Sequence, residues 1–292
     1  MKSGALIRWT RSEVGGIDPS HFLSPELVHY PSTDGITVPA LLYRPRGLRP
    51  GARVPVVIDW HGGPEWQARP RFDFLAQSIA DLGMAVLKPN VRGSDGYGKT
   101  YLQADDGVKR EQALKDIGAS LDFIARQPDL DASRVAAFGG SYGGYMTLAS
   151  VAFYPERFRA AVDVVGISSL PTFLANTSPY RRDLRRVEYG DERIPEVRAV
   201  QERISPLNSA AKIQAALYVL QGKNDPRVPQ SESEQIVRTV RQQGKRTSWY
   251  LLALDEGHGF KKKDTRDYAW ATMLYFLREQ LVGGAQAGAG QK

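Results

Sequence analysis

Cysteine is absent from this chain of 292 residues, and histidine is scarce. Without cysteine the chain can form no disulfide framework, no thiolate zinc site, no iron–sulfur cluster and no cysteine nucleophile. The side chains left for nitrogen ligation or general-base chemistry are four histidines: His21, His29, His61 and His258. Because so few ligands are present, we expect neither a metal nor an organic cofactor.

Long hydrophobic runs are also missing. The longest, such as residues 54–58, are far shorter than the roughly 20 apolar residues that a membrane-spanning helix needs. Residues 1–11 contain no apolar stretch like the core of a secretory signal peptide. The sequence therefore predicts no membrane partner and a cytoplasmic location.

Neither sign of charge dominates the chain. Lys and Arg number 39 against 32 Asp and Glu, a formal net charge of +7. This basic balance raises the question of a nucleic-acid binding module, whose affinity would fall steeply with salt. The basic residues are dispersed, however, and their two local clusters, at 181–186 and 261–263, stand beside acidic residues. We therefore expect solvated basic surfaces and no nucleic-acid partner.

Composition and length favour a globular protein with one large core. Hydrophobic residues make up 42% of the chain and charged residues 24%, which excludes a disordered or fibrous protein. Residues 1–45 are interpreted as an extended segment whose strands flank the turn at Asp34 and Gly35, a strong hairpin signal. The main domain is expected over 46–282, followed by a flexible Gly- and Ala-rich tail at 283–292.

Short apolar runs alternate with amphipathic segments along the main domain. The runs lack strict two-residue alternation, as expected of strands covered on both faces, and the longer segments have helical spacing. This alternation predicts an α/β fold, a mostly parallel sheet with helices on both faces. The predicted strands are 54–59, 84–89, 134–138, 160–165, 216–221 and 248–253. The predicted helices are 71–82, 109–127, 142–152, 195–203, 231–243 and 264–281.

The alternation of predicted strands and helices is interrupted between residues 166 and 208, a segment that contains four prolines and a group of arginines. This segment is too long for a simple connection. We interpret it as a helical excursion over the sheet that forms one wall of a substrate pocket. The alternative is an insertion with no part in binding.

A predicted strand runs into a predicted helix through the sequence Gly139-Gly140-Ser141-Tyr142-Gly143. The pattern Gly-x-Ser-x-Gly places a serine on a strained turn, with its hydroxyl above the sheet. Side chains two residues before or after the serine would collide with the strand or the helix. Ser141 is therefore the candidate nucleophile.

A serine nucleophile needs a base, and the base needs an acid that orients it. Asp225 follows the strand at 216–221, and His258 stands in a Gly-His-Gly turn after the strand at 248–253. The order Ser141, Asp225, His258 is that of the α/β-hydrolase fold. Asp255 is the competing acid, but it lies too near His258 in the chain to reach the far imidazole nitrogen easily.

An oxyanion hole requires two oriented N–H donors. The amide of Tyr142, directly after Ser141, is one candidate. The other is Gly63, in the glycine-containing loop that follows the first parallel strand. His61 in the same loop is interpreted as a structural hydrogen-bonding residue, with a second general base as the alternative.

Together these motifs resemble the catalytic domain of the prolyl oligopeptidase family of serine peptidases, nearest its acylaminoacyl-peptidase and dipeptidyl-peptidase branch. The resemblance spans most of the chain and implies a serine hydrolase that cleaves peptide, amide or ester bonds of short acyl substrates. By position, the resemblance implies that Ser141, Asp225 and His258 form the catalytic triad and that Gly63 and Tyr142 form the oxyanion hole. The matching stretches are 61–64 (HGGP), 90–98 (NVRGSDGYG), 139–145 (GGSYGGY), 222–229 (GKNDPRVP) and 257–259 (GHG).

The resemblance also implies substrate-binding roles. Arg227 matches a position that helps to bind the acyl end of substrates in acylaminoacyl peptidases; a structural ion pair is the alternative. Arg92 and Asp95 are expected to brace their glycine-rich loop. Three further side chains could line an apolar pocket or simply pack in the core: Phe173, Leu174 and Tyr180.

One departure from the family concerns its N-terminal β-propeller, for which 292 residues leave no room: either this chain is an excised domain or the natural chain lacks that cap. An uncapped site would favour small activated acyl compounds, so a carboxylesterase with little peptidase activity is the alternative function. The expected partner is a short peptide or small ester. The absence of a propeller would expose apolar surface, which leaves homo-oligomer formation open. A non-catalytic hydrolase fold is a further alternative, contradicted if Ser141 reacts with a fluorophosphonate probe.

Overall fold

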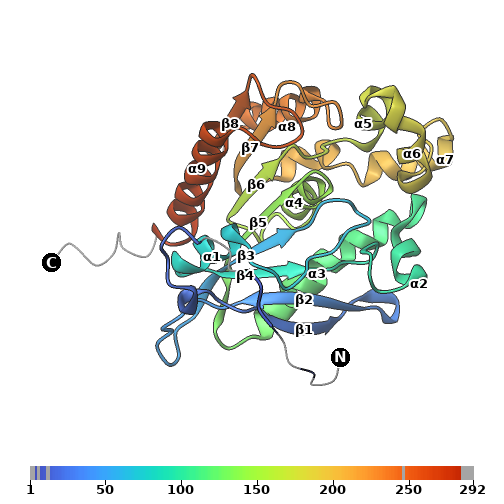
Figure 1. The fold of residues 1–292 in the computed structure, drawn as a ribbon. Helices are drawn as coiled ribbons and strands as arrows, with labels where there is room; N and C mark the ends of the chain where they lie inside the picture. Colours follow the sequence, from blue (N-terminus) through green and yellow to red (C-terminus); the bar gives the residue numbers. More distant parts are fainter. Residues whose placement is uncertain (1–3, 5–6, 11–13, 245–246, 284–292) are drawn as a thin grey trace.

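Eight strands form one sheet in the order β1-β2-β4-β3-β5-β6-β7-β8 (Figure 1). The computed structural model describes residues 4, 7–10, 14–244 and 247–283. Strand β2 runs antiparallel to β1 and to β4, and every other neighbouring pair is parallel. The predicted α/β fold is thus confirmed. The strands are β1 (Glu26–Pro31), β2 (Thr37–Tyr43), β3 (Val54–Trp60), β4 (Ala85–Pro89), β5 (Leu130–Gly140), β6 (Ala160–Val164), β7 (Ala216–Gly222) and β8 (Ser248–Ala253).

Helices cover both faces of the sheet, which explains why apolar and polar residues do not alternate along its strands. Every residue of β6 and β7 is buried. One hydrophobic cluster lies between the sheet and α3 (Arg110–Arg126), α4 (Tyr142–Phe153) and α8 (Gln230–Gln242). A second cluster lies between the opposite face and α1 (Phe74–Asp81) and α9 (Lys263–Leu281). A strand covered on both sides needs apolar residues at successive positions.

Two elements begin three or more residues away from their predicted starts. Helix α1 was expected from residue 71 but begins at Phe74, because the Asp73 carboxylate accepts hydrogen bonds from the Leu75 and Ala76 amides at 3.0 and 3.1 Å. An aspartate in this capping position defines the helix start. Strand β5 begins at Leu130, four residues before the predicted start, because the strand pairing with β3 extends to Val54.

The segment after β6 is helical, as predicted, and lies beyond the carboxyl ends of the parallel strands (Figure 1). Each of its helices has proline in the first turn, where the missing N–H is tolerated. The Glu232 carboxylate of α8 accepts hydrogen bonds from the Ser168 and Ser169 amides at 3.0 and 2.9 Å and so holds the start of this segment. The helices are α5 (Leu170–Asn176), α6 (Pro179–Tyr189) and α7 (Pro195–Arg203).

No helix in the described part of the chain is long and apolar enough to cross a membrane. The predicted flexible tail lies, apart from Gly283, outside the described residues.

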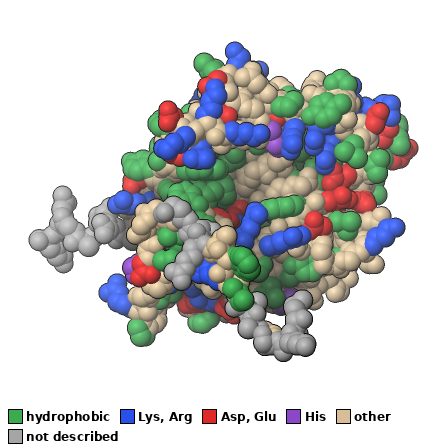
Figure 2. Space-filling model, in the orientation of Figure 1, with side chains coloured by type: hydrophobic (Ala, Val, Ile, Leu, Met, Phe, Trp, Pro, Cys, Tyr) green, Lys and Arg blue, Asp and Glu red, His purple; other side chains and the backbone are tan. Residues whose placement is uncertain are grey.

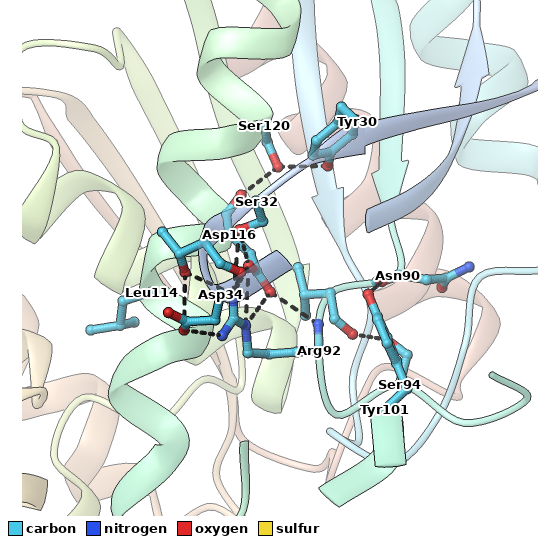
Figure 3. A network of polar contacts seen from close by, with 12 residues as sticks. Tyr30, Ser32, Asp34, Asn90, Arg92, Ser94, Tyr101, Leu114, Asp116 and Ser120 are labelled. Carbon is cyan, nitrogen blue, oxygen red and sulfur yellow. Dashed lines mark hydrogen bonds and ion pairs between the residues drawn. The ribbon is translucent and has the colours of Figure 1, made fainter. Parts of the chain in front are cut away.

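The N-terminal hairpin is tied to the main domain by the buried side chain of Arg92 (Figure 3). Its guanidinium contacts the carboxylate of Asp116 on α3, with Nη2–Oδ1 at 2.8 Å and Nε–Oδ2 at 3.0 Å. The same guanidinium reaches Asp34 and Thr33 in the turn between β1 and β2. Arg92 therefore braces its loop, as expected, and joins that loop to both the hairpin and α3.

We predict that Asp116→Asn lowers the free energy of unfolding by about 3–5 kcal/mol, because it leaves the Arg92 guanidinium buried without its main counter-charge. Urea denaturation measures the loss. Asp122→Asn on the same helix is the matched control: its ion pair with Arg157 is exposed, so the loss should be at most about 1 kcal/mol. Equal losses in both variants would contradict the role assigned to Arg92.

Candidate active site

Ser141 stands alone between the end of β5 at Gly140 and the start of α4 at Tyr142. Its backbone angles are φ 60° and ψ −116°, a conformation that residues other than glycine rarely adopt. Its amide donates a hydrogen bond to the Val164 carbonyl of β6 at 2.9 Å. Strand β6 thus holds the turn in its strained shape, which is the geometry of a nucleophile elbow.

The two glycines that flank the elbow are required by close backbone contacts. A Cβ atom at Gly143 would lie 2.0 Å from the Trp60 carbonyl oxygen, at the end of β3. A Cβ atom at Gly139 would lie 2.4 Å from the Gly143 carbonyl oxygen. Any side chain at either position would push α4 away from the sheet, and the serine would move with it.

His258 and Asp225 meet at the carboxyl edge of the sheet. The imidazole Nδ1 lies 2.7 Å from Asp225 Oδ2, so the ring donates from Nδ1 and its Nε2 is free to accept a proton. The other carboxylate oxygen accepts hydrogen bonds from the Arg227 and Val228 amides at 2.8 and 3.1 Å. The Asp225 side chain is fully buried, and these bonds hold it in position for the histidine.

Close packing brings the loops of Asp225 and His258 together. A Cβ atom at Gly222 would lie 2.1 Å from the Gly257 carbonyl oxygen, and the Asn224 amide donates to the Glu256 carbonyl at 2.9 Å. Asp255, the competing acid, is exposed and pairs with Lys262. The structure therefore places Asp225, and not Asp255, against the imidazole.

Glu256 is a residue of this site that the sequence analysis missed. Its side chain is buried, and its carboxylate accepts hydrogen bonds from the Lys261 and Lys262 amides at 3.2 and 2.9 Å. These bonds close the turn that presents His258. An acidic residue just before Gly-His-Gly was the available signal, but the sequence does not show that its partners are backbone amides.

The Ser141 hydroxyl and His258 Nε2 both remain unengaged within the described residues. Catalytic hydrogen bonds are often long or poorly aligned until substrate is bound. The serine is only half-buried, and the His258 side chain is 15% exposed, so both reacting groups are open to a substrate.

Two backbone amides near Ser141 are free to bind an oxyanion. Gly62 lies beside the serine, since a Cβ atom there would be 3.8 Å from Ser141 Cβ. Among the described residues, neither the Gly63 amide nor the Tyr142 amide has a hydrogen-bond acceptor. Gly63 has φ 129°, a backbone angle that favours glycine. Tyr142 directly follows Ser141 and Gly63 directly follows Gly62, so both predicted donors belong to backbone segments beside the candidate nucleophile and have unoccupied N–H groups.

His61 is held away from catalysis by two partners. Its Nδ1 donates to the Gly62 carbonyl at 2.7 Å, and its Nε2 lies 2.8 Å from the Ser94 hydroxyl. Burial lowers the pKa of His61 to about 4, so the ring is neutral at pH 7. This geometry agrees with the structural interpretation of His61 and gives no support to a second base.

The ring of Tyr142 rests on a buried ion pair that the sequence analysis did not identify. The Arg110 guanidinium lies 5.2 Å from the Tyr142 ring centroid and 4.4 Å from that of Tyr189, both within cation–π range. Asp105 neutralises the arginine, with Nη1–Oδ2 at 2.7 Å. The ion pair anchors the side chain of the residue whose backbone amide is a candidate oxyanion donor. Nothing in the local sequence pairs Arg110 with Tyr142, because the two come together only when α3 packs on α4.

A pocket of about 310 Å³ opens beside Gly63. Burial raises the pKa of Glu188 in its wall to about 6, so at pH 7 this carboxyl is mostly ionised. Three carboxylates face one arginine, and the pocket therefore favours positively charged groups over anionic ones. The residues that line it are Gly63, Glu65, Gln103, Asp106, Leu184, Arg185, Val187 and Glu188.

The other predicted binding residues divide into exposed and buried ones. Arg227 is exposed, and its guanidinium takes part in no ion pair among the described residues. Phe173 and Leu174 are 4% and 0% exposed and pack in the core, so they do not line an open pocket; Tyr180 is exposed on α6. Figure 2 shows a hollow in this face with basic side chains along its upper rim and acidic ones to its right.

Metal ligands do not gather anywhere in the described residues: no three His, Asp or Glu side chains meet in a group that could hold an ion.

Comparison with known proteins matches this arrangement to one family. The sequence pattern of the prolyl oligopeptidase family covers residues 70–284. This chain belongs to the prolyl oligopeptidase family. It is 35% identical over 270 residues to dipeptidyl aminopeptidase BIII of Pseudoxanthomonas mexicana, covering 89% of this chain and 39% of that protein. It is 25% identical to the human acylamino-acid-releasing enzyme, covering 85% of this chain and 34% of the relative.

A solved structure of a peptidase shares the fold. The puromycin-hydrolyzing peptidase of Mycobacterium tuberculosis superposes with a TM-score of 0.85 at 27% identity, over 92% of this chain and 41% of that one. The chain thus spans about two fifths of the length of such relatives.

We predict that Ser141→Ala abolishes covalent labelling by a fluorophosphonate probe and lowers turnover by several orders of magnitude, because no other nucleophile occupies the elbow. Labelling is read by intact-protein mass spectrometry, and circular dichroism checks that the fold is kept. Ser94→Ala, which removes a serine hydroxyl 2.8 Å from His61 Nε2, should leave labelling intact. Labelling that survives in Ser141→Ala would contradict the assignment.

Proposed function

We propose that this chain is a serine hydrolase that cleaves peptide or amide bonds of short acyl substrates through an acyl-enzyme intermediate. The observation that carries the proposal is the contact between His258 and Asp225, 2.7 Å apart, at the sheet edge where Ser141 is exposed on its elbow. Membership of the prolyl oligopeptidase family supports it.

In the acylation step, Ser141 Oγ attacks the substrate carbonyl carbon while His258 Nε2 takes the serine proton. The carbonyl oxygen becomes an oxyanion that the free amides of Gly63 and Tyr142 bind. Each such donor stabilises the transition state by about 3–4 kcal/mol. Asp225 stabilises the resulting imidazolium and keeps the proton on Nδ1. The imidazolium then protonates the leaving amine or alcohol, which departs and leaves the acyl-enzyme.

In the deacylation step, His258 removes a proton from a water molecule that attacks the acyl carbon. The same two amides bind the second oxyanion, and the imidazolium returns the proton to Ser141 Oγ. The products are a free acid and the regenerated serine. This chain's own groups balance every proton transfer, so the sequence of steps calls for no cofactor.

The surface supports a small-molecule or peptide substrate over a nucleic acid or a membrane. Arg185 and Arg186 in the basic cluster of α6 pair with acidic neighbours, among them Glu188 and Glu192. The second cluster pairs in the same way, Lys262 with Asp255. We propose a short peptide or small ester as the partner at this site and a cytoplasmic location.

Amide and ester cleavage make different demands, so a matched substrate pair tests the proposal. We predict that kcat/KM for the p-nitroanilide of an N-acyl amino acid lies within about a hundredfold of that for its p-nitrophenyl ester, because His258 can protonate the leaving nitrogen. Ser141→Ala is the blank. Ester turnover without anilide cleavage would instead indicate a carboxylesterase with the same fold.

Arg227 provides a test of substrate binding. We predict that Arg227→Ala raises KM for an N-acyl peptide anilide about tenfold with a smaller effect on kcat, because its exposed guanidinium is free to bind the acyl carbonyl. Lys223→Ala, an exposed cation two residues before Asp225, is the matched control and should change neither constant. A lowered Tm with unchanged KM in Arg227→Ala would show that the arginine is structural.

A further inference from the structure

Asp163 is a buried carboxyl beneath the nucleophile elbow to which the proposed reaction assigns no role. It lies in β6, is 0% exposed, and neither of its carboxyl oxygens has a hydrogen-bond partner in the described part of the chain. A Cβ atom at Gly144 would lie 2.3 Å from Asp163 Oδ1, and one at Gly166 would lie 2.0 Å from it. The carboxyl is therefore packed between the first turn of α4 and the turn after β6.

These surroundings favour the neutral acid. Burial raises the pKa of Asp163 to about 8. The backbone N–H of Gly166 lies near the carboxyl without making a hydrogen bond of good geometry and partly opposes this rise, whereas the negative charge of Glu232 on α8 adds to it. The neighbouring strands place Gly139 and Val219 beside it, and α4 places Gly144 there, so none of these elements brings a cation.

The position matters because the first turn of α4 carries the Tyr142 amide. The amino end of a helix has a partial positive charge, which stabilises anions close to it. An ionised carboxylate packed on Gly144, two residues after Tyr142, would oppose that field in a region of low dielectric. A neutral carboxylic acid in the same place leaves the field intact.

We propose that Asp163 is a positioning residue that works as a neutral acid, and that its ionisation sets the alkaline limit of oxyanion binding in this site. The inference rests on the proposed function. The proposed role of Asp163 differs from the roles of the triad residues, because Asp163 contacts no reacting atom and acts through the amino end of α4.

The pH profile of kcat/KM tests this inference. We expect the wild-type profile, measured between pH 6 and 10 with a p-nitrophenyl ester and corrected for spontaneous hydrolysis, to fall about tenfold per pH unit above pH 8. Asp163→Asn, which keeps the size of the side chain and cannot ionise, should lose this fall when each profile is normalised to its value at pH 7. Asp255→Asn, an exposed acid near His258, is the control and should keep it.

Two results would overturn the inference: a wild-type profile that stays flat to pH 10, or an alkaline fall in Asp163→Asn equal to that of the wild type. The Asp255→Asn control tests whether the loss of any acidic side chain, and not of Asp163 in particular, removes the alkaline fall in kcat/KM. A profile that falls in both the wild type and Asp255→Asn, and is flat in Asp163→Asn, supports it.

Stability gives a readout that does not need turnover. Asp163 ionises near its ordinary value of 3.8 in the unfolded chain and near 8 in the folded one, so the unfolded state binds fewer protons between these values. The folding equilibrium constant of the wild type should therefore fall relative to Asp163→Asn by up to tenfold per pH unit from about pH 4 to 8. A ratio that stays constant would show that Asp163 is not neutral. Absence of Ser141-dependent turnover would overturn the proposed function while leaving this measurement decisive for the protonation state.

Discussion

The close approach of the Gly143 backbone to the end of β3 is the constraint on which the site depends. The Trp60 carbonyl occupies the space that a side chain at Gly143 would need. This contact sets the distance between α4 and the sheet, and with it the height of Ser141 and the direction of the Tyr142 amide. The positive φ of Ser141 is maintained because β6 and α4 are both held in place by burial.

Buried charge organises the rest of the site. The pairs Arg92–Asp116 and Arg110–Asp105 each include one residue of α3; the first reaches the N-terminal hairpin and the second the ring of Tyr142. Asp163 differs from both pairs, since its carboxyl has no counter-charge. Removing a charge from water is costly, so each buried ion has a partner or gives up its charge. The same principle accounts for the two ion pairs and for the neutral acid.

The loops that carry Asp225 and His258 are held to each other. These loops are joined by the Gly222 contact and by the hydrogen bond from Asn224 to Glu256, so the acid and the base are held close to each other. The serine belongs to a different unit, the elbow. Ser141 and His258 therefore come from separately held parts of the site, and a bound substrate can tighten the contact between them.

Local sequence determined much of this protein. The apolar runs predicted the six parallel strands, and Gly-x-Ser-x-Gly and Gly-His-Gly identified Ser141 and His258, because strand burial and tight turns leave their mark on neighbouring residues. The predicted start of α1 was wrong, since the observed start depends on the capping hydrogen bonds that the Asp73 carboxylate accepts. The tertiary structure alone decided that Arg110 supports Tyr142, that Phe173 packs in the core and that Asp163 lies against Gly144. These are contacts between residues distant in the chain, and the sequence carries no local pattern for them because their energy arises only when the elements pack.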